Sequence, residues 1–233
     1  DHIRQQALFK QYYATPDHRF HLLPPGISPD RRAPANADEL RVVARRKLGA
    51  EFALPADGLL LVQIGSDFER KGLDRSIHAL AALPETLRTR TRLVALGSDD
   101  PAKMQGLADQ LGVGKQVFMP GGRADVPDFL LAADLLLHPA YRESAGMVLL
   151  EATVAGLPVL TTDTCGYARY VREAGSGEVI ASPFSQQALD DTLQKMVSQL
   201  PGPWQENGVE YGRNPALYCL AQTVVDHVEG WTP

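Results

Sequence analysis

The stretch "DLLLHPAYRESAGMVLLEATVAGLPVLTT", residues 134–162, places a longer apolar segment between two short apolar runs. Residues 134–140 and 158–162 have the length of strands, while residues 146–156 have the length of a helix. The first run does not alternate with polar residues, as expected for a strand that is buried on both faces. A strand, a helix and a second strand joined by short connections predict a parallel sheet that is covered by helices.

The same rhythm recurs along most of the chain. Further strands are predicted at 20–24, 59–66, 92–98, 116–121 and 177–181, and further helices at 73–83, 101–111, 125–133, 167–174 and 185–199. We therefore predict an α/β fold, in which a Rossmann-like parallel sheet carries helices on both faces.

The two ends and one connection do not follow this rhythm. Residues 1–19 predict a helix and a turn, and residues 203–230 predict one or two helices after the break at "PGPW" (201–204). Residues 30–58 form a polar connection that contains the basic helix "ELRVVARRKLG". Its cations are typical of a solvated helix face, which we favour, although they could also touch an anionic membrane surface.

The bulk composition is that of an ordinary soluble globular protein, with 44% hydrophobic and 22% charged residues. The net charge of −5 argues against nucleic-acid binding, and no apolar run approaches the ~20 residues that span a bilayer. Cys165 and Cys219 show no zinc or redox spacing and are typical of a reducing compartment. Because the chain opens with "DHIRQQ", without an initiator methionine or a signal peptide, we expect a truncated cytoplasmic protein.

Charged residues and glycines follow several of the predicted strands directly. Arg70 and Lys71 follow one strand and Glu143 follows another. Gly26 and Arg31 follow a third. Ligands bind at the carboxyl ends of the strands in an open parallel sheet, so these residues are expected to meet at one edge.

A helix that is predicted to begin at about Gly146 adds a second feature to this edge. Backbone N–H groups at a helix start bind anions, and nearby cations add full charge, so the combination predicts a diphosphate site. Glu143 lies before this helix and Glu151 about one turn inside it. Two carboxylates would repel a phosphate, but each can accept two hydrogen bonds from a vicinal diol. The pair therefore predicts a nucleotide sugar, whose diols flank its diphosphate; two unrelated solvated carboxylates are the alternative.

Other chemistries find little support in the sequence. It contains no phosphate-binding glycine loop, no Gly-x-Ser-x-Gly and no His-Glu-x-x-His, and no Asp-x-Asp triplet that would hold a metal ion on a diphosphate. We therefore predict neither a metal nor a cofactor. His138 is either a general base or, as we favour, a hydrogen-bonded structural residue. Cys165 has no activating histidine near it in sequence and is expected to be inert.

Several segments resemble one enzyme family. "ESAGMVLLE" (143–151) and "AGLPVL" (155–160) are similar to the Glu-x7-Glu motif region of retaining glycosyltransferases of the GT-B fold, family 4. The resemblance extends through "VQIGSDFERKGLDRSI", "LGVGKQVFMPGGRADV", "ADLLLHPAY" and "TTDTCGYARYV", and so covers nearly all of residues 20–190. Within the family it points to the glucosyltransferases of the bacterial lipopolysaccharide core.

The resemblance implies a role for each charged residue at the sheet edge. Glu143 is similar to the acid that holds the hexose hydroxyls, and Glu151 to the acid on the ribose hydroxyls. Lys71 matches the lysine on the donor diphosphate. Arg70 and Arg31 resemble further contacts to the phosphates or the leaving group. By this resemblance Arg31, Lys71 and Glu143 are the predicted catalytic residues.

Several other positions complete the predicted donor site. They are Gly26, Ser66, Arg123, Ala145, Gly146 and Met147. The backbone amides of 145–147 would face the hexose and the phosphates, and Arg123 lies where the uracil-binding loop of the family falls. Ser66 departs from the family pattern, because many members carry an arginine there. Arg70 and Arg31 are expected to supply the missing charge.

The resemblance also implies a domain organisation. A GT-B enzyme has two Rossmann-like domains with the active cleft between them, and the acceptor-binding domain comes first. We expect residues 1–19 to be a stub that leads from a missing acceptor domain, and residues 20–200 to be the donor-binding domain. Residues 201–233 would form a helical segment that packs back on the missing domain.

The implied reaction is transfer of glucose from UDP-glucose to a heptose of the lipopolysaccharide inner core, with retention at the anomeric carbon. The expected partners are UDP-glucose or UDP and, through the missing domain, the lipopolysaccharide core acceptor. A peripheral position at the inner face of the bacterial inner membrane is compatible with this reaction. This chain alone is expected to bind the UDP-sugar without turnover. A non-catalytic nucleotide-sugar binding module and a GT-B protein similar to sugar-nucleotide epimerases are the alternatives.

Overall fold

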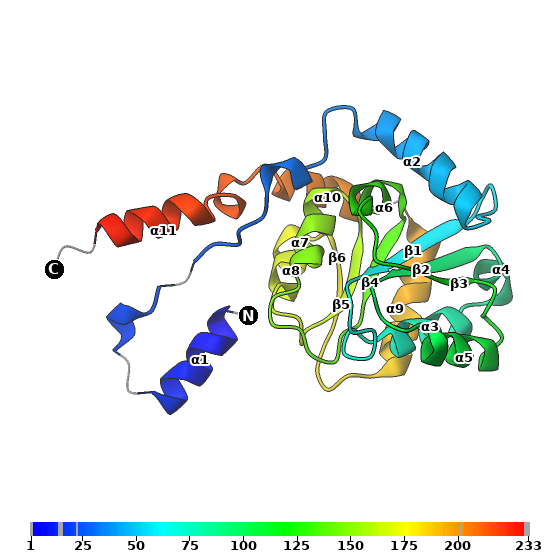
Figure 1. The fold of residues 1–233 in the computed structure, drawn as a ribbon, viewed down its shortest axis with the longest axis horizontal. Coiled ribbons are helices and arrows are strands. Elements are labelled where there is room, and N and C mark those ends of the chain that lie inside the picture. Colours follow the sequence, from blue (N-terminus) through cyan, green and yellow to red (C-terminus); the bar gives the residue numbers. More distant parts are fainter. Residues whose placement is uncertain (1, 14–15, 22, 201, 231–233) are drawn as a thin grey trace.

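The computed structural model describes residues 2–13, 16–21, 23–200 and 202–230, and within them six parallel strands form one sheet (Figure 1). The strands are β1 (Leu59–Ile64), β2 (Thr91–Leu96), β3 (Val117–Gly121), β4 (Leu135–His138), β5 (Val159–Thr162) and β6 (Gly177–Ile180). Each coincides with a strand that the sequence predicts. Their order across the sheet is β3-β2-β1-β4-β5-β6.

The direction in which the chain crosses the sheet reverses between β1 and β4. From β1 the chain steps outward to β2 and β3, and then returns to β4 on the other side of β1. β4 pairs with β1 in parallel, at Leu61↔Leu135 and Val62↔Leu136. Ligands bind outside the carboxyl ends of the strands at such a switch point. The loops after β1 and β4 are therefore the first place to look for a site.

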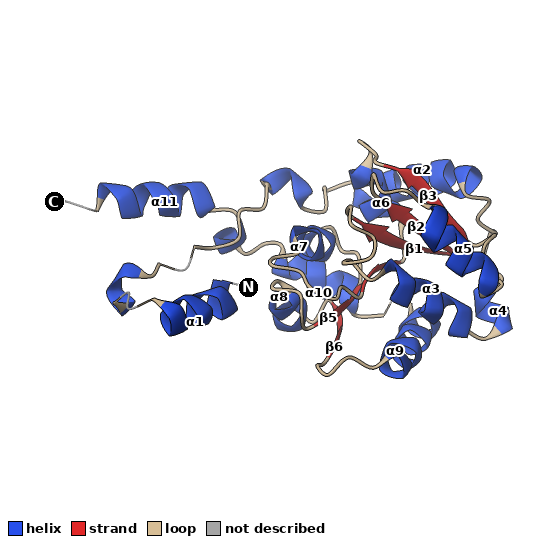
Figure 2. Cartoon of the chain, turned by 60° about the horizontal axis from the view of Figure 1, so that its bottom comes forward, coloured by secondary structure: helices blue, strands red, loops and turns tan. Residues whose placement is uncertain are grey.

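Helices cover both faces of the sheet (Figure 2). One layer contains α3 (Leu73–Ala82), α5 (Ala102–Gln110) and α9 (Gln186–Gln199). The other contains α2 (Ala37–Glu51), α6 (Val126–Ala132), α7 (Met147–Val154), α8 (Ala168–Ala174) and α10 (Trp204–Tyr211). A short helix that was not predicted, α4 (Glu85–Arg88), precedes β2. The predicted α/β fold is confirmed.

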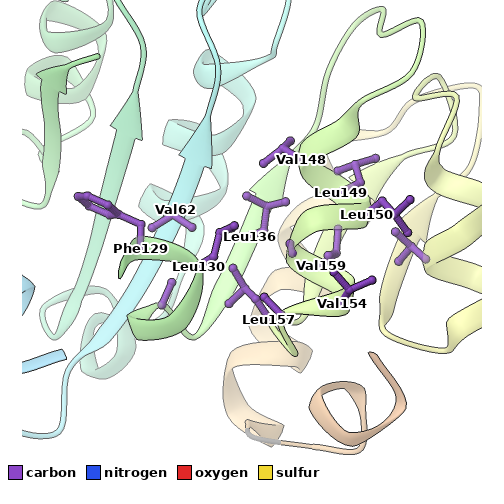
Figure 3. Packing of buried hydrophobic residues seen from close by; sticks show 14 of the residues in the cluster. Val62, Phe129, Leu130, Leu136, Val148, Leu149, Leu150, Val154, Leu157 and Val159 are labelled. Atoms are coloured by element: carbon purple, nitrogen blue, oxygen red, sulfur yellow. The ribbon is translucent and has the colours of Figure 1, made fainter. Parts of the chain in front are cut away.

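Alternate residues of the central strands pack into two separate cores. Leu61 of β1 belongs to the cluster that includes α3 and α9, whereas Leu60 and Val62 belong to the cluster that includes α6 and α7. Figure 3 shows Val62 and Leu136 from the sheet in the second of these clusters. Because neighbouring strand residues point to opposite faces, a strand covered on both sides is apolar throughout. Burying each such leucine stabilises the fold by about 1.5–3 kcal/mol.

The prediction of a strand at residues 20–24 is wrong. Phe20, His21, Leu23 and Pro24 have no strand structure, and residue 22 lies outside the described residues. Proline cannot donate a backbone hydrogen bond to a neighbouring strand, so an apolar run that ends in two prolines is poorly suited to a sheet. The segment instead lies between two 3-10 turns, η1 (Asp17–Arg19) and η2 (Pro29–Arg31).

The helices at the two ends lie beside the sheet and not on it. α1 (His2–Tyr12) and α11 (Leu220–Glu229) extend beyond α7 and α8, away from the strands (Figures 1 and 2). They carry exposed apolar side chains, among them Tyr12, 75% exposed, and Val228, 60% exposed. Within the described part of the chain, no helix is both long and apolar enough to cross a bilayer.

Three cations of the basic helix bind groups of neighbouring elements. Arg41 donates to the carbonyl of Leu131 (3.0 Å), and Arg45 donates to the carboxylate of Asp134 (2.8 Å). Lys47 binds two carboxylates at the start of α6. These bonds attach α2 to α6 and to the start of β4. Arg46 and Lys47 are exposed, as on the solvated helix face that we favoured, while Arg41 and Arg45 are partly buried against the domain.

Candidate functional site

The loops after β1 and β4 are locked together at the switch point. Gly72, between Lys71 and α3, has φ +73°, and a Cβ atom there would lie 2.2 Å from the carbonyl oxygen of Pro139. Only glycine fits such a backbone and such a close approach. The amide of Tyr141 donates to the carbonyl of Arg70 (2.9 Å) and joins the same two loops. Residues 67 positions apart (Gly72 and Pro139) and 71 positions apart (Arg70 and Tyr141) are thus held side by side.

Lys71 and Glu143 meet in this junction. The ammonium group of Lys71 binds the Oε2 atom of Glu143 directly, and the guanidinium of Arg70 lies 3.5 Å from the same atom. The side chains of Lys71 and Glu143 are only 13% and 11% exposed. Arg70 is also held by Asp67 (2.7 Å). We predicted from the sequence that these residues share an edge, and the structure brings them into contact.

Glu143 is ionised at neutral pH in this environment. His138, whose Nε2 atom lies 3.8 Å from Oε2, lowers the pKa of Glu143 most strongly, and Lys71 lowers it further. Burial opposes both influences, and the resulting pKa is about 2. Glu143 is therefore a permanent hydrogen-bond acceptor, as binding of sugar hydroxyls requires.

Backbone bonds place Glu143 at the start of α7. The amide of Gly166 donates to the carbonyl of Glu143 (3.1 Å), and the amide of Tyr167 donates to the carbonyl of Ala145 (2.7 Å). Gly146, with φ +83°, is the residue that precedes the helix. The helix starts as predicted, with Met147 as its first residue and partly exposed. The first N–H groups of a helix have no partner within it and favour anions.

The second acid of the motif also faces a cation. Arg31 Nε lies 3.5 Å from Oε1 of Glu151, with the two side chains 32% and 22% exposed. The segment that carries Arg31 is attached to α7, because the amide of Ala33 donates to the carbonyl of Val154 (3.0 Å). Each acid of the Glu-x7-Glu motif therefore has its own cationic partner, one from the loop after β1 and one from the segment before α2.

Three predicted site residues have other partners. Ser66 Oγ accepts from the amide of Ser98 (3.0 Å) and links the loops after β1 and β2. Arg123 is paired with Glu51 (2.6 Å) and Asp125 (2.9 Å), and the carboxylates, Asp125 first, raise its pKa. Gly26 lies against α11, where an added Cβ atom would meet a leucine methyl group at 2.3 Å. No hydrogen bond or ion pair of the described residues joins these three to Lys71 or Glu143.

His138 lies close to Glu143, a contact that we did not predict from the sequence. Its side chain is fully buried, and neither ring nitrogen has a hydrogen-bond partner among the described residues, contrary to our expectation of a hydrogen-bonded residue. Cys165 lies next to it, so the thiol does have a histidine neighbour. Burial raises the pKa of Cys165, but His138 together with the hydroxyl groups of Thr161 and Thr162 lowers it below its ordinary value. Both residues follow or end adjacent strands of the predicted sheet, and that position could have revealed the contact.

A metal site or a cavity among the described residues could also hold a ligand. The described residues contain no group of three or more His, Cys, Asp or Glu side chains that could hold a metal ion. A cavity of about 720 Å³ lies between α3 and α5, lined by Asp74, Lys103 and Tyr141 among others. Lys71 and Glu143 do not line it. Sheet topology and charge pairing, and not cavity size, single out the switch point as the candidate site.

Comparisons with known proteins identify the family of the chain. The family model of glycosyl transferases group 1 matches residues 45–214. Lipopolysaccharide glucosyltransferase WaaG of Escherichia coli K12 is 48% identical over 97% of this chain and 60% of its own. The D-inositol 3-phosphate glycosyltransferase of Stackebrandtia nassauensis is 31% identical over 84% of this chain and 44% of its own.

Solved structures show where the chain falls within such proteins. The crystal structure of WaaG superposes with a TM-score of 0.88 over 97% of this chain and 60% of that one, and the match is to its C-terminal half. Anabaena HepE in complex with UDP and glucose has the same fold at 20% identity, with a TM-score of 0.79 over 97% of this chain and 60% of that one. The chain spans about 60% of the length of WaaG. It belongs to the group 1 glycosyl transferases, with the fold of the C-terminal half of a GT-B protein.

Proposed function

We propose that this chain is the donor-binding part of a retaining glycosyltransferase that transfers glucose from UDP-glucose to a heptose of the lipopolysaccharide inner core. The observation that carries the proposal is the pair of acid–cation contacts, Lys71 with Glu143 just before α7 and Arg31 with Glu151 on the side of α7. The similarity to a lipopolysaccharide glucosyltransferase over 97% of the chain supports the choice of substrate class.

A nucleotide sugar would exchange these contacts for its own. Its diphosphate would take Lys71 and Arg31, together with Arg70, as charge-assisted partners. The carboxylates so released would accept hydrogen bonds from the two diols, Glu143 from the hexose and Glu151 from the ribose. The amides of residues 145–147 would meet the hexose and the phosphates, and Arg123, Ser66 and Gly26 would form the outer part of the donor site.

The cations would act on the bond that breaks. The bond between the anomeric carbon and the phosphate oxygen cleaves, and the negative charge that develops on the departing diphosphate is stabilised by Arg31, Arg70 and Lys71. The acceptor hydroxyl forms its new bond on the same face of the sugar, and its proton passes to a phosphate oxygen. No protein nucleophile is needed in this route, and we assign none.

The rest of the enzyme would complete the site. We propose that a preceding domain binds the acceptor and that residues 1–19 lead out of it. Of the segment 201–233, α10 packs on α7 and α8 of this domain, so the proposed return to the preceding domain would be made by α11. The exposed apolar side chains of α1 and α11 support such a contact. A cytoplasmic enzyme at the inner face of the inner membrane would meet both substrates. The chain alone would bind the donor without turning it over.

Calorimetric titration of this chain with UDP, UDP-glucose and UDP-galactose tests the proposal. We expect UDP to bind and Glu151→Ala to weaken it by about 10-fold, since a hydrogen bond to a charged group contributes about 1.5–3 kcal/mol. Glu210→Ala, which removes an exposed acid paired with Arg213, is the matched control and should change nothing. Glu143→Ala should reduce the preference for UDP-glucose over UDP. Equal UDP affinity for the wild type and Glu151→Ala would exclude the ribose role.

A further inference from the structure

His138 is placed directly beneath the carboxylate of Glu143. It is the last residue of β4, and its ring is fully buried. Its backbone carbonyl accepts from Thr161 Oγ1 (2.9 Å) and from the amide of Ala140 (3.0 Å), so its main chain is fixed. Its Nε2 atom lies 3.8 Å from Oε2 of Glu143, the oxygen that binds Lys71.

A buried imidazole without a hydrogen bond is costly, because each unpaired polar nitrogen forfeits its hydration. Neither ring nitrogen of His138 has a hydrogen-bond partner among the described residues. The groups that face it are Glu143, Cys165 and Lys71, which come from three different loops. Burial lowers the pKa of His138, but Cys165 and Glu143 raise it above its ordinary value. In the ligand-free arrangement the ring therefore interacts with Glu143 at 3.8 Å without a hydrogen bond to it.

The proposed function creates a use for the ring. When the donor arrives, Lys71 must leave Glu143 for the diphosphate, which removes the closest partner of a carboxylate that is 11% exposed. A buried carboxylate without its partner is energetically unfavourable, so the side chain of Glu143 is expected to rotate toward another hydrogen-bond donor. A movement of about 1 Å would bring Oε2 within ordinary hydrogen-bond distance of Nε2 of His138.

We infer that His138 is a positioning residue for Glu143: its Nε2–H group takes the carboxylate when Lys71 moves to the diphosphate, and so holds the other carboxylate oxygen toward the hexose. The inference rests on the proposed function of Glu143 in donor binding. It predicts that His138 affects the contribution of the hexose to affinity and leaves the contribution of UDP unchanged.

Two substitutions separate positioning from packing. His138→Phe keeps a ring of similar shape and removes the N–H group, whereas His138→Gln retains an N–H group near the position of Nε2. We expect His138→Phe to lower the ratio of the UDP-glucose to the UDP association constant by about 10-fold, with the UDP constant changed less than 2-fold. His138→Gln should retain most of the ratio. His78→Phe, at an exposed histidine of α3, is the control and should match the wild type.

A packing role would give a different result. If His138→Phe weakened UDP and UDP-glucose equally, or if His138→Gln failed to restore the ratio in a folded protein, the inference would be overturned. If the wild-type chain bound no UDP at all, the proposed function would be in question and not His138 itself.

A measurement made without the donor tests the role of His138 separately from the proposed function. In 15N-histidine NMR spectra of the ligand-free Lys71→Ala chain, the Nε2 proton of His138 should move downfield and exchange more slowly, because Glu143 is then free to accept from it. Adding Glu143→Gln should reverse that shift, and His138→Gln identifies the resonance. An unchanged His138 resonance in Lys71→Ala would exclude the proposed transfer of the carboxylate, whatever the chain binds.

Discussion

The two acid–cation pairs of the site differ in how they are built. The Lys71–Glu143 pair lies between loops that follow adjacent central strands, with both side chains less than 15% exposed. The Arg31–Glu151 pair joins a 3-10 turn to the side of α7, at 3.5 Å and with the side chains 32% and 22% exposed. The first pair is part of the fold, whereas the second is attached to its outside. The difference indicates that a ligand exchanges the second pair at little cost to stability and the first at a greater cost.

The largest expected effect comes from breaking the inner pair. Lys71→Ala leaves the carboxylate of Glu143 buried without its closest partner, and we expect it to lower the free energy of unfolding by about 3 kcal/mol. This loss is at the lower end of the range that is typical for breaking a buried ion pair, because Arg70 remains 3.5 Å from Glu143. Urea denaturation of the wild type and the variant measures it.

Restoring neutrality should reverse the loss. In the double variant Lys71→Ala/Glu143→Gln no unpaired charge remains, so most of the lost stability should return. If the double variant were as unstable as Lys71→Ala, the loss would come from packing and the electrostatic comparison between the two pairs would be wrong.

The inner pair also shows what the sequence could predict. Unalternated apolar runs identified β1 and β4, and the rule that ligands bind at the carboxyl ends of parallel strands placed Lys71 and Glu143 at one edge. The helix start at Gly146 followed from the same reasoning. These inferences succeed because they depend on local patterns and on a property of every parallel sheet.

Other features depend on contacts between distant parts of the chain. The pairing of Arg123 with Glu51 depends on how α2 packs beside α6. The surroundings of the buried His138 ring depend on residues from three different loops. The strand predicted at 20–24 failed for a similar reason, since an apolar run becomes a strand only where a neighbour can pair with it. The two prolines at 24–25 were a local warning against that strand, whereas the contacts of Arg123 and His138 have no local signal.

The junction between the loops can be tested by itself. Gly72→Ala would place a Cβ atom 2.2 Å from a backbone oxygen of the loop after β4, on a residue with φ +73°. We expect a loss of about 2 kcal/mol in the free energy of unfolding, since both the backbone and its neighbour must move. The change would disturb the inner pair without altering its charges.

Gly26→Ala is the matched control for this substitution. Its Cβ atom would meet the side chain of Leu220, with the Cδ2 methyl group nearest at 2.3 Å, on the outlying helix α11, and that side chain can turn away. We expect a change within about 0.5 kcal/mol by the same denaturation measurement. A similar loss for both variants would show that the region outside the sheet is as tightly held as the switch point.

The smallest effect on stability is expected at the outer pair. Arg31→Ala removes a partly exposed ion pair, which typically contributes less than about 1 kcal/mol, so the free energy of unfolding should hardly change. The affinity for UDP should nevertheless fall by about 10-fold, because the proposed diphosphate contact is lost. Arg213→Ala, which removes an exposed pair with Glu210, should change neither quantity. Such a result would show that Arg31 contributes to ligand binding and not to the stability of the fold. If Arg31→Ala instead destabilised the protein as much as Lys71→Ala, both pairs would be structural, and the division between them would fail.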